Sequence, residues 1–345
     1  MERTFEKVFR EEEDQQAVED LVELGEYANG EAIPDVMRGE IELYLNSLSN
    51  NKAPGVDGVP KELLVAGGEA VIQWLEELCQ GAIGGRGIVR DWSRMEIIPF
   101  HKKGDAAECA NYRPISLLPH AYKVFAKLIQ NRMKQREEEI LGEEQAGFRS
   151  GRGTVDHIFT LLQVIEKRWE KNKDTYCVFI DFKQAFDSIN REYMIRVMRG
   201  CGFQEELLNT LEELYRNTTA RVRKADIVTE NFETTRGVIQ GCPLSPHLFN
   251  LYLERVMLEA LEGEEAGVEI VGIRINYLRY ADDIVVIAET VEDLQRMVGR
   301  IEEQCRRYRL IINRNKTKSL KIGREITNMY ICFNTGEVEQ DNSFK

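Results

Sequence analysis

The 345-residue sequence predicts a mixed α+β fold in which helices cover one face of a mainly antiparallel sheet, with an α/β arrangement as the alternative. Residues 175–182, TYCVFIDF, form a continuous β-branched and aromatic run that is typical of a buried central strand. Residues 275–288 contain two further apolar runs, INYL and IVVIA, on either side of a short polar stretch, as in a β-hairpin. Apolar residues at helical spacing recur between these strands, so helices and strands interleave.

The first half of the chain has a mostly helical pattern. Residues 1–50 are acidic, and their apolar side chains stand at helical spacing: Leu21, Leu24, Met37, Ile41, Leu45 and Leu48. Residues 50–60, NNKAPGVDGVP, carry two prolines and two glycines and predict an ordered loop or a domain boundary. Further helical patterns follow at about residues 60–82, 120–140, 154–171, 190–201 and 204–216.

The second half alternates between strands and helices. Residues 219–225 and 227–234 form a predicted hairpin, and the Gly- and Pro-rich residues 235–246 lead from it into an apolar helix, HLFNLYLERVMLEALE. After the hairpin of residues 275–288, residues 290–310 predict an amphipathic helix, and short strands are expected around LIIN (310–313) and SLKIG (319–323).

Composition limits the classes of protein to consider. The net charge of −13 argues against general coating of nucleic acid, but residues 1–50 alone hold 14 acidic and 4 basic side chains. Basic stretches at 100–105, 148–153 and 221–224 are therefore local phosphate contacts or solvated loops. The seven scattered cysteines form no C-x-x-C pair and predict reduced thiols without a zinc site. With no membrane-length apolar run and a charged N-terminus, we expect an intracellular protein, nuclear or cytoplasmic, with no membrane partner.

Two adjacent acids, Asp282 and Asp283, lie between the apolar runs of the second hairpin. The simplest interpretation is a polar turn, because Asp is common where strands reverse. Rigid flanking strands would also hold both carboxylates at one point, where they repel each other unless a cation or a proton intervenes. Asp181 ends the predicted buried strand and needs a partner there, which makes it the natural third acid. Carboxylates from a turn and from a neighbouring strand can bind a pair of Mg²⁺ ions for in-line nucleotidyl transfer.

Ordered motifs connect these acids to a known family. Four segments resemble motifs A to D of reverse transcriptases: FIDFKQAFDSI (179–189), RGVIQGCPLSPHLFNLYLE (236–254), YADD (280–283) and RLIINRNKTK (309–318). Three upstream segments are similar to those of non-LTR (LINE-type) retrotransposon polymerases: NKAPGVDGVPKELL (51–64), NYRPISLLPHAYKVFAKLIQNRM (111–133) and EEQAGFRSGRGTVDHI (143–158). The resemblance runs from about residue 50 to the C-terminus and implies right-hand polymerase fingers and palm, with an antiparallel palm sheet backed by helices.

The resemblance assigns metal-binding roles around motif A and YADD. It implies that Asp181 and Asp282 are the main metal ligands and that Asp283 is a more auxiliary acid. The backbone carbonyl of Phe182 would complete one metal shell. Phe186 stands where the family places an aromatic ring that excludes the 2′-hydroxyl, so deoxynucleotides are the expected substrates. A core phenylalanine at the start of a helix is the alternative interpretation of Phe186.

Two groups of cations match nucleotide-binding positions of the family. Lys103 and Arg113 correspond to finger residues that grip the triphosphate, because Arg offers a planar fork and Lys a point charge. Lys102 is the alternative to Lys103. Lys316 corresponds to a lysine near the pyrophosphate that acts as a proton donor, although Lys318 next door makes a solvated strand charge a competing interpretation.

Further residues match family positions that contact the incoming nucleotide, the primer or the template. Gln240 and Gly241 match the loop that lies on the incoming nucleotide and the template base, with a plain structural turn as the alternative. Tyr280 would pack near the primer end or serve as a half-buried strand tyrosine. The family's template-facing segment, which would hold single-stranded RNA, corresponds to Gln145, Phe148, Arg149 and Arg152.

Together these expectations describe an RNA-directed DNA polymerase core that uses an RNA template, a DNA or RNA primer, dNTPs and two Mg²⁺ ions, with Mn²⁺ as a substitute. Three parts are expected: an acidic helical extension (1–50), fingers (51–174), and a palm with interleaved fingers elements (175–345). Full-length relatives carry an endonuclease upstream and a thumb downstream, so we expect an absent or incomplete thumb and a truncated retrotransposon protein. The alternatives are a catalytically silent nucleic-acid-binding remnant and an RNA-dependent RNA polymerase.

Overall fold

The computed structural model describes residues 2–10, 33–325, 327–334 and 336–341. The chain forms two compact units, each built from two segments: Met1–Ile140 with Ile189–Leu248, and Leu141–Ser188 with Phe249–Lys345. The predicted helix at Leu21 and Leu24 lies outside the described residues, and the three-part division of the chain stays a prediction. Among the helices of the described residues, none combines the length and the apolarity needed to cross a membrane.

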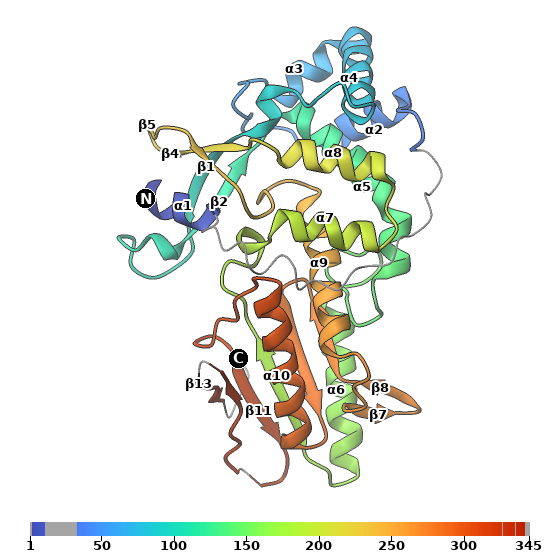
Figure 1. The fold of residues 1–345 in the computed structure, drawn as a ribbon, viewed down its shortest axis with the longest axis vertical. Coiled ribbons are helices and arrows are strands. Elements are labelled where there is room, and N and C mark those ends of the chain that lie inside the picture. The colour runs from blue at the N-terminus through green and yellow to red at the C-terminus, as the bar shows by residue number, and fades with distance from the viewer. Residues whose placement is uncertain (1, 11–32, 326, 335, 342–345) are drawn as a thin grey trace. The chain divides into compact units, whose positions relative to one another are not determined.

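Helices make up most of the regular secondary structure of the first unit (Figure 1). They are α1 (Glu2–Phe9), α2 (Arg38–Ser47), α3 (Lys61–Ala66), α4 (Gly68–Ile83), α5 (His120–Ile140), α7 (Arg191–Gly200) and α8 (Glu205–Tyr215). The pattern at 60–82 is divided between α3 and α4, because Gly68 adopts a left-handed conformation with φ of 54°. The apolar face of α5 is buried, and its Phe125 stacks on Trp92 with ring centroids 4.9 Å apart.

A mixed sheet completes the first unit. Its strands are β1 (Arg94–His101), β2 (Tyr112–Leu117), β4 (Thr219–Lys224), β5 (Ile227–Val228) and β6 (Phe232–Glu233), in the order β2-β1-β4-β5 with β6 also on β4. Strand β1 is antiparallel to β2 and parallel to β4. The buried Glu96 of β1 pairs with Arg221 and Arg223 of β4 at 2.6 and 2.9 Å, so this basic stretch is partly neutralised within the sheet.

The sheet of the second unit is mainly antiparallel, and this confirms the predicted mixed α+β class. Its order is β14-β11-β3-β10-β9, and the β11 and β14 pair alone among these neighbours is parallel. The strands are β3 (Thr175–Ile180), β9 (Tyr277–Tyr280), β10 (Asp283–Ala288), β11 (Lys318–Ile322) and β14 (Glu339–Gln340). Smaller pairs are β7 (Val268–Ile270) with β8 (Ile273–Ile275) and β12 (Cys332–Phe333) with β13 (Gly336–Glu337). Around LIIN, by contrast, Ile312 makes a single isolated bridge to Phe182 and no regular strand forms.

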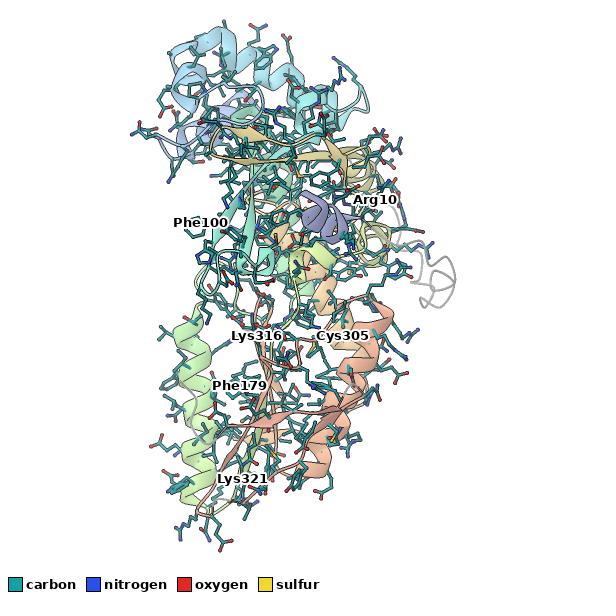
Figure 2. The ribbon with its side chains drawn as sticks, turned by 90° about the vertical axis from the view of Figure 1, so that its left-hand side faces the viewer. Arg10, Phe100, Phe179, Cys305, Lys316 and Lys321 are labelled. Atoms are coloured by element: carbon teal, nitrogen blue, oxygen red, sulfur yellow. The ribbon has the colours of Figure 1, made fainter. Side chains whose placement is uncertain are left out.

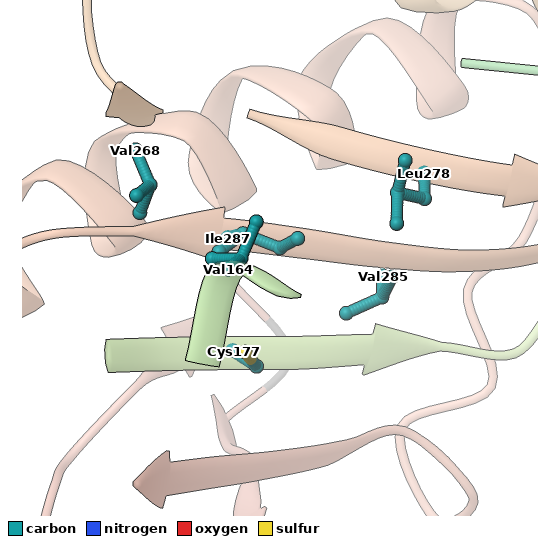
Figure 3. Packing of buried hydrophobic residues seen from close by; sticks show 6 residues of the cluster. All are labelled: Val164, Cys177, Val268, Leu278, Val285 and Ile287. Carbon is teal, nitrogen blue, oxygen red and sulfur yellow. The ribbon is translucent and has the colours of Figure 1, made fainter. Parts of the chain in front are cut away.

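Helices pack on both faces of this sheet, where the sequence pattern predicted one covered face. Figure 2 shows the sheet between α6 (Thr154–Glu170) and α10 (Val291–Arg307). On the α6 face, Val164 packs with Cys177 of β3 and Ile287 of β10, which pair across the two strands (Figure 3). Alternate residues of β3 and β10, such as Val178 and Val286, are also buried, since strand side chains alternate between faces. Helix α9 (Ser245–Ala260) belongs to this unit from Phe249 onward.

Candidate active site

Two of the predicted acids lie across from each other at one end of the second unit's sheet. Ile180 of β3 pairs with Ile284 of β10 in antiparallel register. The residues beyond this pair are Asp181 and Asp283, so their backbones continue side by side where the strands leave the apolar core. The buried strand run and the hairpin therefore bring together two side chains that are far apart in the sequence.

The turn between β9 and β10 carries the third acid. Tyr280 pairs with Asp283 and closes a turn formed by Ala281 and Asp282. Ala281 has a φ of 56°, a left-handed conformation that a residue with a Cβ adopts at a cost of about 1 kcal/mol. Asp282 is half-buried, whereas Asp283 is exposed. The turn is thus a fixed and mildly strained structure.

The surroundings of Asp181 combine the predicted Lys316 with two groups that the sequence did not single out, Asn313 and Thr317. Asn313 Nδ2 donates to Asp181 Oδ1 at 3.0 Å, and Lys316 Nζ lies 3.6 Å from the same oxygen (Figure 2 labels Lys316). The backbone N–H of Asp181 donates to Thr317 Oγ1 at 3.3 Å. Lys318 instead pairs with Glu339. The structure therefore places Lys316 beside the acids and Lys318 on a different partner. Asn313 precedes Lys316 by three residues in motif D, and this proximity in the sequence could have suggested that it belongs to the site.

Electrostatic repulsion acts between the two facing carboxylates. Although the residue as a whole is exposed, protein atoms around the Asp283 carboxyl partly desolvate it, and this desolvation raises its pKa above the ordinary value. The charge of Asp181 raises this pKa further, and Lys316 partly offsets both effects. A divalent cation relieves such repulsion, and carboxylate oxygens are the ligands that Mg²⁺ prefers. Within the described residues, no group of three or more His, Cys, Asp or Glu side chains is arranged to hold a metal ion as it stands. The donor chemistry of the site fits Mg²⁺, but a three-carboxylate cluster is not preformed.

Two phenylalanines follow Asp181. Phe182 is buried and forms an isolated bridge to Ile312, which ties the motif D segment to the end of β3. Phe186 is half-buried and stacks on Phe249 of α9, with ring centroids 4.6 Å apart and planes 17° apart. The stacking fixes the ring plane of Phe186 while leaving part of its surface open, so both interpretations of this residue remain compatible with its position.

The predicted template-facing residues differ sharply in exposure. Phe148 is 51% exposed, and its ring centroid lies 6.4 Å from that of Tyr280, next to the acidic turn. The guanidinium of Arg152 donates two hydrogen bonds to the carboxylate of Glu143, at 2.7 and 2.9 Å. Gln145 is 1% exposed and Arg149 is 7% exposed. Arg149 donates to the backbone carbonyls of residues 142 and 145, so its guanidinium serves the protein's own loop.

The other predicted nucleotide-binding residues belong to the first unit. Lys103 and Arg113 are exposed, and Arg113 lies on β2 opposite Phe100 of β1. The carbonyl of Gln240 accepts a 2.9 Å hydrogen bond from the N–H of Ser116, also on β2. The first unit therefore holds the Gln240–Gly241 loop against the strand that carries Arg113.

The fold and the facing carboxylates of the second unit define the class of nucleic-acid polymerases that use a palm sheet. The chain belongs to the reverse transcriptase family: the family profile described as "Reverse transcriptase (RNA-dependent DNA polymerase)" matches residues 100–336.

Individual relatives come from non-LTR retrotransposons. The chain is 31% identical over 210 residues to the Pol polyprotein of retrotransposable element R2 from Nasonia vitripennis, covering 61% of this chain and 20% of that protein. It is 28% identical over 291 residues to the probable RNA-directed DNA polymerase from transposon BS of Drosophila melanogaster, covering 81% and 31% respectively. The chain thus spans between about a fifth and a third of the length of these relatives.

A solved structure shares the fold. Apo telomerase from Candida Tropicalis, truncated from its C-terminal domain, aligns with a TM-score of 0.52 at 13% sequence identity. The alignment covers 76% of this chain and 58% of the telomerase chain. At this identity the likeness concerns the fold alone.

Proposed function

We propose that this chain is the catalytic core of an RNA-directed DNA polymerase, which adds deoxynucleotides to the 3′-hydroxyl of a primer on an RNA template. The observation that carries the proposal is the pair of facing carboxylates, Asp181 and Asp283, with Lys316 beside them, in a chain of the reverse transcriptase family. The name of the transposon BS relative, a probable RNA-directed DNA polymerase, supports the same activity.

In the proposed mechanism, Asp181, Asp282 and Asp283, together with the carbonyl of Phe182, would hold two divalent cations. Mg²⁺ supplies the charge that lowers the cost of forming the primer alkoxide and of expelling pyrophosphate. Asn313 donates to one oxygen of Asp181 and so restricts the rotation of that carboxylate. The side chain of Lys316 is 63% exposed beside the acids, where its ammonium can hold a proton for the leaving pyrophosphate.

The remaining roles follow the family's motifs. Lys103 and Arg113 would grip the triphosphate, and the loop of Gln240 and Gly241 would lie over the incoming base pair. Phe186 would exclude the 2′-hydroxyl. Phe148 and Tyr280 would face the nucleic acid with Arg152, because aromatic faces stack on unpaired bases. For Gln145 and Arg149, whose polar groups bind the protein's own loop, we assign no template contact.

Primer extension tests the catalytic acids. The purified chain, an RNA template with an annealed DNA primer, dNTPs and Mg²⁺ should give extended primer, and Asp282→Asn should lower the rate by about 10³-fold because it removes a charge that acts on the metal ions. Asp226→Asn, the same change at an exposed turn between β4 and β5, is the matched control and should leave the rate unchanged. Equal incorporation by wild type and Asp282→Asn would remove the proposal, and binding of template and primer without incorporation would support the silent alternative.

Substrate choice tests Phe186. Phe186→Val opens space where the ring is expected to meet the sugar, so the ratio of rNTP to dNTP incorporation should rise at least about 10-fold. The ratio is informative because loss of the stacking on Phe249 lowers stability for both substrates alike. An unchanged ratio would assign Phe186 to the core, and a wild-type preference for rNTPs would favour an RNA-dependent RNA polymerase.

A further inference from the structure

The segment of residues 144–147 extends the sheet of the second unit beside the acidic turn. The N–H of Ala146 donates to the carbonyl of Arg279 at 3.0 Å, and the N–H of Arg279 donates to the carbonyl of Glu144 at 2.7 Å. Gln145 and Arg279 form a parallel bridge. The segment therefore pairs with β9, the edge strand, immediately before the strand enters the turn.

The side chain of Gln145 reaches from this segment to the turn. Its Oε1 accepts from the N–H of Gly147 at 2.8 Å and from the N–H of Ala281 at 3.2 Å. Its Nε2 donates to Oδ1 of the buried Asn250, and Nδ2 of Asn250 donates to the carbonyl of Gly147 at 2.9 Å. An uncharged amide supplies both the two acceptor sites and the donor that this arrangement uses, which explains a glutamine at a position that is 1% exposed.

Close packing holds the same turn from the same segment. A Cβ at Gly147 would lie 2.5 Å from the backbone N of Ala281, so the two backbones touch where no side chain could fit. Ala281 is left-handed and persists in that conformation only where its surroundings determine it. The residue that follows is Asp282. The Gln145 amide and the backbone of Gly147 thus fix the position and conformation of Ala281, the residue that directly precedes Asp282 and Asp283.

We propose that Gln145 is a positioning residue for the carboxylates of the turn. This role deepens the proposed polymerase function and rests on it. Gln145 touches neither substrate nor cation in this scheme; it acts through the N–H of Ala281. Displacement of the carboxylates by even about 1 Å weakens the binding of divalent cations and slows catalysis. Replacement of Gln145 is therefore expected to lower the affinity of the site for metal ions.

Gln145→Met tests the proposal, because methionine keeps the length of the side chain and removes all of its strong hydrogen bonds. Gln163→Met, on the surface of α6 in the same unit, is the matched control. For each protein, Mn²⁺ binding is measured by electron paramagnetic resonance, and nucleotide incorporation is measured across a range of Mg²⁺ concentrations. For Gln145→Met we expect Mn²⁺ affinity to fall and the half-saturating Mg²⁺ concentration to rise, each by about 5- to 50-fold. Gln163→Met should match wild type in both.

A second variant covers the case in which Gln145→Met does not fold. Gly147→Ala keeps the Gln145 amide and pushes on Ala281, so it should lower Mn²⁺ affinity in the same direction. Wild-type Mn²⁺ affinity in a folded Gln145→Met or Gly147→Ala protein would overturn the positioning role, even if the variant melts at a lower temperature. A wild type that binds Mn²⁺ but incorporates no nucleotide would end the polymerase proposal alone, whereas a wild type that binds no Mn²⁺ would end both.

Discussion

Two lysines of motif D, Lys316 and Lys318, have different surroundings although one residue separates them. The N–H groups of Lys316 and Thr317 both donate to the carbonyl of Asn313, at 3.0 and 2.9 Å, which forms a tight turn before β11. This turn directs Lys316 toward Asp181, whereas Lys318 has already joined the strand and pairs with Glu339. One cation is therefore part of the acidic site and the other stabilises the sheet.

Replacing each lysine by methionine should separate these roles. Lys316→Met removes the positive charge beside Asp181 and the proposed proton donor, so we expect single-nucleotide incorporation to slow by about 10- to 100-fold. Lys318→Met loses only a partly exposed ion pair, which contributes less than about 1 kcal/mol, and should incorporate at the wild-type rate. Single-turnover kinetics at saturating dNTP give both rates. An equal decrease of the incorporation rate in the two variants would show that Lys316 is a solvated surface charge without a catalytic role.

The acids of the site are visible in the sequence, whereas the residue that holds their turn in place, Gln145, is not recognisable there in that role. The sequence places Asp181 at the end of a buried strand run and Asp283 at the turn of a hairpin. Antiparallel pairing of the two strands then brings these acids to the same end of the sheet. The resemblance assigns Gln145 to the family's template-facing segment and gives no sign of a role in supporting the acidic turn. Its hydrogen bond to Ala281 joins residues 136 positions apart, and no local pattern encodes such a contact.

At the scale of elements, the loop of residues 235–246 depends on one glycine. Gly241 has a φ of 104°, and a Cβ there would lie 2.9 Å from the carbonyl oxygen of Ser116. The preceding carbonyl, of Gln240, accepts from the N–H of Ser116. The loop is thus docked on β2 by a backbone hydrogen bond and a close backbone approach, and this approach requires glycine at position 241 for both its conformation and its lack of a side chain.

Gly241→Ala should therefore destabilise the protein by about 1 to 3 kcal/mol, because it adds backbone strain and a contact with a carbonyl that cannot move freely. Gly39→Ala is the matched control: Gly39 lies in α2 with nothing within 4 Å of an added Cβ, and alanine there should stabilise by up to about 1 kcal/mol. Urea unfolding monitored by circular dichroism measures both changes. A neutral Gly241→Ala would show that the loop does not rest on β2 in solution.

The elements that the sequence predicted well are those with long, uniform patterns. The run at 175–182 became β3, and the patterns at 120–140, 154–171, 190–201 and 204–216 became α5, α6, α7 and α8. The strand predicted at LIIN (310–313) was wrong. This short segment after α10 makes one isolated bridge, between Ile312 and Phe182, and does not form a regular strand. Helices on both faces of the sheet were also missed. Alternation shows that strand faces are apolar, but it does not reveal what covers each face.

At the scale of the whole molecule, each compact unit buries thiols in its own core. Cys79 and Cys242 are buried in the first unit, and Cys177 and Cys305 are buried in the second. Burial raises the pKa of the Cys79 and Cys177 thiols to about 12, so the reactive thiolate is scarce even before access is considered. Cys332 is exposed. The cysteines can therefore report separately on the integrity of each unit.

Alkylation followed by mass spectrometry turns this distribution into a test of the two-unit division. In the native protein at about pH 8, the exposed Cys332 should be alkylated first, and the four buried thiols should react at least about 10³-fold more slowly than Cys332. As urea is raised, Cys79 and Cys242 should become reactive at one concentration, and Cys177 and Cys305 should become reactive together, because each pair shares one cooperative core. Reaction of Cys79 together with Cys177 at a concentration that leaves Cys242 and Cys305 protected would contradict the division. Fast native labelling of Cys177 would be more damaging, because it would mean that the strand ending in Asp181 is not held in a closed sheet.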